Sequence, residues 1–172
     1  MQPPTHLASG ILIQRSLEKI QPKLLRYTCL ALLCLLAHWF LDKLARYTYH
    51  PSQPLIDDWF WILYHIIVTF LTVYIFVTYW RKYKAGLLFS LLPDLDWIIL
   101  YPLRWIFPQN PYLNDSVLHR TVFIFFDRLP LFKLMSFIPN RTLGRAGALW
   151  EFILLGILFL LLKRREAVNA PG

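Results

Sequence analysis

Four long apolar runs alternate with short polar stretches along the chain. They cover residues 24–41, 59–79, 85–107 and 146–162. The run 24–41 would form a helix of about 27 Å at 1.5 Å per residue, close to the roughly 30 Å hydrocarbon layer of a bilayer. The pattern predicts an all-α, polytopic membrane bundle with about four transmembrane helices, built as one domain over residues 1–172.

Two other segments have helical character but are less apolar. Residues 5–20 follow Pro3 and Pro4 and mix apolar with charged positions, which predicts an interfacial helix lying on the membrane or partly in it. Residues 108–145 predict a turn-rich loop with an interfacial or re-entrant helical piece that is cut at Pro130. Within the third run, Pro93 predicts a kink or a break, because proline removes a helical hydrogen bond and clashes with the preceding turn.

The composition supports the membrane assignment and excludes two other classes of protein. Hydrophobic residues make up 57% of the chain and charged residues only 16%, whereas a soluble domain has about 25% charged residues. A soluble fold of this size could not bury so much apolar surface. Aromatic residues make up 17%, and disordered chains are poor in them.

Basic residues give the chain a net charge of +8 and flank the apolar runs, where such residues anchor helices and set their orientation. The basic N-terminal arm, the loop at 81–84 and the C-terminal tail favour both termini in the cytoplasm. The six basic residues of the longer segment 104–145 argue against it, although long connections weigh less. No basic stripe on a soluble module is visible, so we expect the lipid bilayer, and no nucleic acid, as a partner. The sequence names no protein partner.

Polar side chains inside the apolar runs are the candidate chemistry. Burying Asp at a bilayer centre costs about 2.5–3.5 kcal/mol, so each such residue calls for a partner or a function. His38 and Asp42 are four apart and share one helix face, where imidazole and carboxylate can bind one metal ion or each other. Asp94 and Asp96 follow the break at Pro93 and would project into the polar cavity that such a break lines.

Three further histidines extend this set. His65 belongs to a polar stripe of the second run, which must face protein and not lipid. Nitrogen and oxygen donors of this kind suit zinc, with manganese as the alternative divalent ion. Asp96 is the predicted general base or bridging ligand, and Arg120 is predicted to hold an anionic group of the substrate. The candidate metal ligands are His6, His38, Asp42, His65, Asp94 and His119.

Most of these residues also have a structural interpretation. A single histidine in a membrane helix is often a hydrogen-bonded packing residue, which applies to His65. His38 and Asp42 can form a simple hydrogen bond on one helix face. Asp94 and Asp96 can form a helix-breaking turn in which Asp96 caps the next helix. Glu151, beside Trp150, is interpreted as an interfacial anchor.

Four short motifs, THLASG, LAHWFLD, LLPDLDW and LHR, together resemble the membrane-bound metal-dependent hydrolase family, the YdjM-like inner-membrane proteins. The metal residues of that family are a histidine near the N-terminus, a Pro-Asp-x-Asp-His segment, a His-Arg-Gly-x-Thr-His-Ser segment and a His-x-x-x-Asp pair. By motif, they fall on His6, on Asp94 and Asp96, on His119, and on His38 with Asp42. The resemblance implies a location in a bacterial inner membrane.

The sequence departs from this family pattern at two ligand positions. The histidine expected after the second Asp is Trp97, and the second histidine of the His-Arg segment is absent. The His-x-x-x-Asp pair also precedes the Pro-Asp segment instead of following it. The site is then either a divergent one completed by His65 or a degenerate one. A second similarity, in the N-terminal Thr-His and the His-x-x-x-Asp pair, is to zinc-dependent phospholipase C-like proteins and implies a phosphodiester substrate.

These observations leave three hypotheses of function. The first is a membrane-embedded metal-dependent hydrolase that acts on a lipid or another amphiphile through the His/Asp site. The second is a non-enzymatic structural or regulatory membrane subunit, in which the polar residues join helices by internal hydrogen bonds. The third is a small ion-coupled transporter, because a broken helix with two carboxylates is typical of ion-coupled sites.

Overall fold

The structure is a computed structural model and describes residues 1–49, 55, 57–107, 109–110, 116–130, 133 and 144–168. Within them every regular element is helical, which confirms the predicted all-α class. The α-helices are α1 (Pro3–Ser16), α2 (Lys23–Leu44), α3 (Trp59–Leu91), α4 (Leu95–Ile106), α5 (Val117–Asp127) and α6 (Gly147–Val168). Two short 3₁₀ turns, η1 (Ala45–Tyr47) and η2 (Leu92–Asp94), follow α2 and α3.

Two helical stretches of the described chain are long and apolar enough to cross a membrane, by length and composition. They are Lys23–Tyr47, which joins α2 to η1, and Trp59–Arg104, which runs through α3 and η2 into α4. The predicted spans 59–79 and 85–107 are therefore not separated by a polar loop at 81–84. Instead, α3 continues through that basic segment to Leu91 and is interrupted by a kink at Tyr83.

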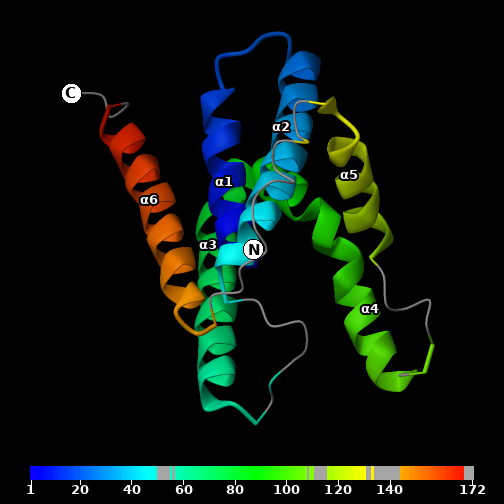
Figure 1. Ribbon diagram of the computed structural model, residues 1–172. Coiled ribbons are helices and arrows are strands. Elements are labelled where there is room, and N and C mark those ends of the chain that lie inside the picture. The colour runs from blue at the N-terminus through cyan, green and yellow to red at the C-terminus, as the bar shows by residue number, and fades with distance from the viewer. Residues whose placement is uncertain are drawn as a thin grey trace.

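The N-terminal helix α1 lies in the middle of the molecule, between α2, α3 and α6 (Figure 1). Pro3 and Pro4 start it, since the first turn of a helix has no hydrogen-bond partner for its amide groups. Thr5, His6 and Leu7 are completely buried. The structure thus differs from the expected interfacial helix, because α1 has small or apolar residues on more than one face and can be enclosed.

Glycines set the distance between α1 and α3. A β-carbon added at Gly10 would lie 2.3 Å from the carbonyl oxygen of Gly86, and one added at Gly86 would lie 2.4 Å from the carbonyl oxygen of Gly10. No side chain fits at either position without moving a backbone. The two helices therefore touch backbone to backbone, as small residues allow in membrane proteins. Around this contact lie Leu7, Ile11, Ile75, Leu87 and, from α6, Leu155.

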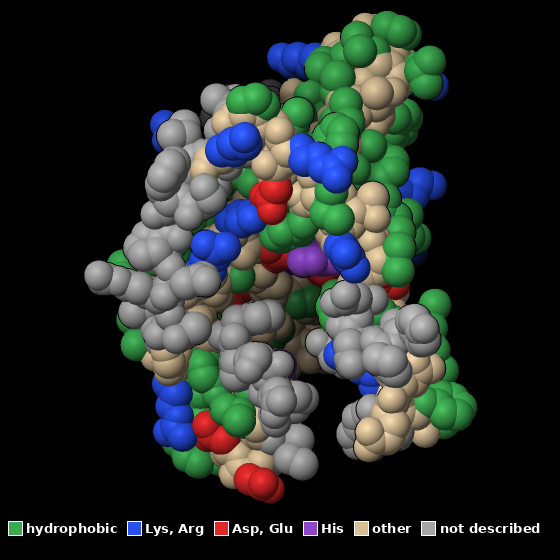
Figure 2. Space-filling model, turned by 45° about the vertical axis from the view of Figure 1, so that its right-hand side comes forward, with side chains coloured by type: hydrophobic (Ala, Val, Ile, Leu, Met, Phe, Trp, Pro, Cys, Tyr) green, Lys and Arg blue, Asp and Glu red, His purple; other side chains and the backbone are tan. Residues whose placement is uncertain are grey.

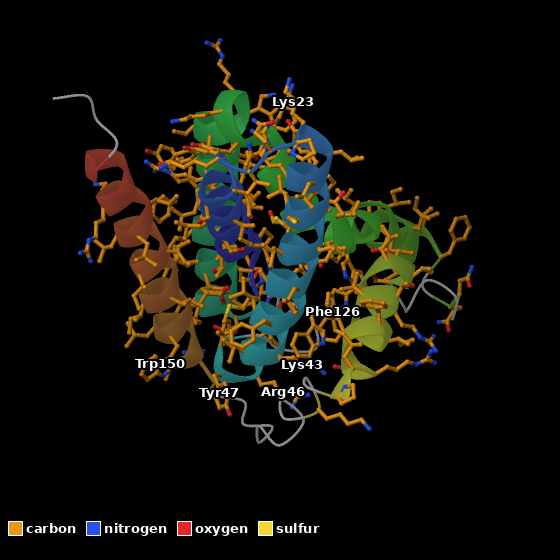
Figure 3. The ribbon with its side chains drawn as sticks, turned by 90° about the horizontal axis from the view of Figure 1, so that it is seen from above. Lys23, Lys43, Arg46, Tyr47, Phe126 and Trp150 are labelled. Atoms are coloured by element: carbon orange, nitrogen blue, oxygen red, sulfur yellow. The ribbon has the colours of Figure 1, made fainter. Side chains whose placement is uncertain are left out.

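The predicted break at Pro93 is confirmed: α3 ends at Leu91, and η2 turns the chain into α4. In Figure 1, α4 and α5 lie on the other side of α2 from α6. Helix α5 packs on α2, where the Trp39 and Phe126 rings lie 5.9 Å apart and Trp39 Nε1 donates to Asp127 at 2.9 Å. Figure 3 shows Phe126 on the α5 side of this contact, near Lys43 at the end of α2. Much of the predicted loop at 108–145 lies outside the described residues.

Candidate metal centre

Four of the predicted ligands meet in one place. His38 and Asp42 come from α2, Asp94 from η2 and His119 from α5, and one donor atom from each lies within 4.8 Å of the other three. Asp42 Oδ2 is 2.7 Å from His119 Nε2 and 3.1 Å from His38 Nε2, and Asp94 Oδ1 is 3.5 Å from His38 Nε2. Donors around a tetrahedral zinc ion stand about 3.4 Å apart. Two nitrogens and two oxygens grouped this closely can share one divalent ion once His119 Nε2 and Asp42 Oδ2, now at hydrogen-bond distance, move apart by about 0.7 Å.

Figure 2 shows a histidine with acidic side chains at the floor of a hollow in this face of the molecule, and Lys and Arg side chains around its rim. The four proposed ligands also differ in how deeply they are buried. His38 is buried, whereas Asp42, Asp94 and His119 are partly exposed. One side of the cluster is therefore enclosed by helices, and the other can be reached from outside.

The Nε2 atom of His38 faces the cluster without a hydrogen in the neutral ring. Its Nδ1 lies 2.9 Å from the carbonyl oxygen of Ser90, which can only accept, so Nδ1 carries the hydrogen. In the neutral ring Nε2 then has a free lone pair, and this buried atom has no hydrogen-bond partner. It faces the carboxylate oxygens of Asp42 and Asp94, and lone pairs that converge in this way repel each other unless a proton or a metal cation lies between them. The donor set therefore fits a metal ion, and Ser90 orients the ring as partners of metal-bound histidines do.

His6 of α1 lies directly beside this group. Its ring stacks on that of His38 with centroids 4.0 Å apart, and its Nε2 is 3.1 Å from Asp42 Oδ1. The amino nitrogen of Met1 contacts the same oxygen. Burial lowers the pKa of His6. The N-terminal helix thus brings a third histidine to the cluster.

Asp96 has contacts that differ from its predicted role. One of its oxygens accepts from the Ser116 hydroxyl at 2.6 Å, and the other accepts from the Leu118 amide at 2.9 Å. Ser116 in turn caps α5 by accepting from the His119 amide at 3.0 Å. Asp96 therefore holds the first turn of the helix that carries His119. Its role as a general base or bridging ligand stays a prediction.

The structure does not bring His65 to the four donor atoms. His65 Nδ1 lies 2.7 Å from the carbonyl oxygen of Trp61, on its own helix, and the two rings are 4.0 Å apart. This is the packing arrangement that the sequence offered as the alternative for His65. Arg120, next to His119 on α5, is exposed, and its binding of an anionic group stays a prediction.

Glu151 differs from its interpretation as an interfacial anchor, because it is 3% exposed. Its carboxylate accepts from the Tyr64 hydroxyl at 2.7 Å and from the backbone amide of Gln2 at 2.6 Å. Glu151 therefore joins α6 to α3 and to the start of α1. Neighbouring Trp150 is exposed.

Sequence reasoning missed the contributions of Ser90 and Ser116. Ser90 acts through its carbonyl oxygen, and no side-chain pattern reveals a backbone acceptor. Ser116 did carry a signal, since a serine before a helical run is a typical N-cap.

No protein-family model, curated protein or solved structure matches this chain. The resemblance to the membrane-bound metal-dependent hydrolases rests on the short motifs given above.

Proposed function

We propose that this protein is a membrane-embedded, metal-dependent hydrolase that acts on a lipid or another amphiphilic substrate. The observation that carries the proposal is the buried Nε2 of His38, which lies 3.1 Å from Asp42 Oδ2 and converges with Asp42, Asp94 and His119 on a partly open site. A buried nitrogen without a hydrogen bond is unfavourable unless something binds it.

The residues at such a site would have different roles: some bind the ion, and others hold the ligands in position. His38, Asp42, Asp94 and His119 are the proposed ligands, and His6 supports Asp42 from the buried side. Ser90 and Asp96 fix the orientation of the two histidine-bearing elements. A divalent ion bound here would supply Lewis-acid chemistry and lower the pKa of a water molecule toward about 7.

Zinc is the proposed ion, with manganese as the alternative. The chemistry of the donors supports this, since imidazole and carboxylate are common zinc ligands and neither is a soft thiolate. Cys34, although buried on the same helix, is not among the four grouped donors.

We further propose about four membrane spans, with both termini in the cytoplasm of a bacterial cell and the protein in its inner membrane. The exposed apolar side chains support an environment of lipid, since Phe70 and Val77 of α3 and Leu160 of α6 are each about 70% exposed. The basic residues at the ends of the apolar runs support the orientation.

Metal content measured by mass spectrometry on detergent-purified protein tests the proposal. The wild type is expected to hold about one zinc or manganese ion per chain after reloading, and His38→Ala and Asp94→Ala are expected to lose it. Asp58→Asn is the matched control, because Asp58 caps α3 and pairs with Arg145. A wild type that holds no divalent ion after reloading would overturn the proposal.

His65→Ala belongs in the same experiment. We expect full metal content in this variant, because the His65 ring is held by Trp61 on its own helix. Loss of the ion would instead mean that His65 completes a divergent site.

A second candidate function is a structural or regulatory membrane subunit with a degenerate site. The observation that favours it is Trp97, which stands where the resembling family has a histidine. In that case His38→Ala lowers thermal stability while the wild type binds no metal.

A further inference from the structure

A cavity of about 630 Å³ adjoins the candidate metal centre. Three of the four proposed ligands, Asp42, Asp94 and His119, form part of its wall. The remainder comes from the N-terminal residues 1–3, from η1, from the middle and end of α3, from the start of α4 and from α5. Its size lies within the range of about 300–1,000 Å³ that is usual for ligand pockets.

The wall beyond the ligands is almost entirely apolar. Leu91, Leu95, Trp97 and Phe123 contribute most of the large side chains. Thr72 is one of two other polar residues, and its hydroxyl donates to the carbonyl oxygen of Val68 in its own helix at 2.7 Å. No Lys or Arg of the described chain lines the cavity.

We propose that this cavity encloses the hydrocarbon chain of the substrate, with the scissile polar group held at the metal centre. The inference rests on the proposed hydrolase and specifies its substrate as a long-chain lipid recognised by its chain. A charged head group enclosed here would need a buried partner charge, and the cation of the described wall, the Met1 ammonium, is already paired with Asp42. A methylene chain needs only apolar contact, which these side chains provide.

The surroundings of the cavity suit entry from the bilayer. On α4, Leu95 lines the cavity, and Ile99, one turn further, is 64% exposed. On α3, Thr72 lines the cavity while Phe70 and Val73 are exposed on other faces. A lipid chain can therefore pass between apolar surfaces of α3 and α4, which belong to one candidate membrane stretch, without crossing water.

Alkyl hydroxamates test this assignment, because their head group chelates a divalent ion and their chain length can be varied. The protein is loaded with Co²⁺, and the visible spectrum of the ion reports binding of acetohydroxamate or dodecanohydroxamate. Thr72→Trp fills the cavity, and Val77→Trp adds the same bulk to an exposed position on the same helix. Ala45→Phe, at another point of the wall, replaces Thr72→Trp if that variant does not fold.

We expect Thr72→Trp to weaken dodecanohydroxamate binding at least tenfold and to leave acetohydroxamate binding within twofold. Val77→Trp should change neither affinity. If the cavity-filling variant affects both probes equally, or neither, the chain lies elsewhere and the inference is wrong.

Failure of the metal site is detected separately, because the wild type would then give no Co²⁺ spectrum. In that case, a dodecyl probe with a terminal diazirine is crosslinked to the protein in lipid nanodiscs. Labelling of the cavity wall that is lost in Thr72→Trp and kept in Val77→Trp supports an enclosed chain. Labelling confined to exposed faces of the helices overturns it.

Discussion

His38 acquires its chemical character from a backbone atom in another helix. The carbonyl oxygen of Ser90 fixes the hydrogen on Nδ1, so the ring can offer only Nε2 to the cluster. The sequence could predict the pair of His38 and Asp42, because residues four apart lie on the same face of a helix. It could not predict Ser90, whose contribution depends on where α3 ends. It identified capping by Asp96 as one alternative, but Asp96 holds the distant helix α5 instead of the helix that follows it.

Asp96→Ala is predicted to weaken both α5 and the metal centre. The variant removes the acceptors for Ser116 and Leu118, which should lower the free energy of unfolding by about 1 kcal/mol, as for a lost helix cap. Metal affinity should fall about 10–100-fold, because His119 loses its orientation. Competition titration with a zinc chelator and thermal unfolding in detergent measure the two effects.

Asp96→Asn keeps one acceptor oxygen, so its stability and metal affinity should lie between those of Asp96→Ala and the wild type. Unchanged metal affinity in Asp96→Ala would contradict the positioning role and favour the predicted base.

At the scale of elements, the Gln14 side chain of α1 replaces one backbone hydrogen bond that is missing from α3. A regular helix joins the carbonyl of residue 82 to the amide of residue 86, but Tyr83 has non-helical φ and ψ of −124° and 28°. The Gln14 amide occupies the opening: its oxygen accepts from the Gly86 amide at 2.6 Å, and its nitrogen donates to the Lys82 carbonyl at 3.3 Å. An inserted side chain of this kind is a recognised cause of helix kinks. The kink directs the last turns of α3, and with them Ser90 and Asp94, toward α2.

Gln14→Leu is predicted to lower the free energy of unfolding by about 1–3 kcal/mol, because the Gly86 amide and the Lys82 carbonyl lose their partner. Metal affinity should fall with it, since Ser90 and Asp94 depend on the direction of α3 after the kink. Thermal unfolding and the chelator titration report both. Ser16→Ala is the control on the same helix, because its hydroxyl bonds to Leu12 of α1 itself. Equal stability of Gln14→Leu and Ser16→Ala would show that the kink does not need Gln14.

The elements differ in how far the sequence determines them. The apolar runs located α2 and the start of α3, and Pro93 located the turn after α3, because both signals are local. The basic stretch at 81–84 suggested a loop, yet α3 runs through it. Gln14 bridges the broken hydrogen bond there from 68 residues away. The sequence also could not predict the interior position of α1. That position depends on the fit of Gly10 against Gly86 and not on the hydrophobicity of the segment alone.

Over the whole molecule, Glu151 connects the first, third and last helices. Its two oxygens accept from the start of α1 and from Tyr64 of α3, and the Thr5 hydroxyl is 3.5 Å away. A second link joins α1 to α6 near their other ends, where the Arg15 guanidinium donates to the carbonyl oxygen of Leu162 at 3.0 Å. Helix α6 is thus held to α1 by hydrogen bonds at two levels as well as by apolar packing.

Glu151→Ala is predicted to destabilise the protein by about 3 kcal/mol, because it leaves the buried donors of Gln2 and Tyr64 without an acceptor. Glu151→Gln should cost less, since the amide oxygen can still accept from one of them. Leu149→Ala, at an exposed position of the same helix, should stay within about 0.5 kcal/mol of the wild type. Thermal unfolding of the three variants in one detergent makes the comparison. A loss in Glu151→Ala no greater than in Leu149→Ala would show that packing alone holds α6.

The central position of α1 has a consequence for the order of assembly. This helix precedes its partners α3 and α6 in the chain and is therefore made before them. Neither the contact of Gly10 with α3 nor that of Arg15 with α6 can form until these helices have left the ribosome. Helix α1 can therefore reach its native place only after α6 has been made, and the metal centre beside it can be fully enclosed only then.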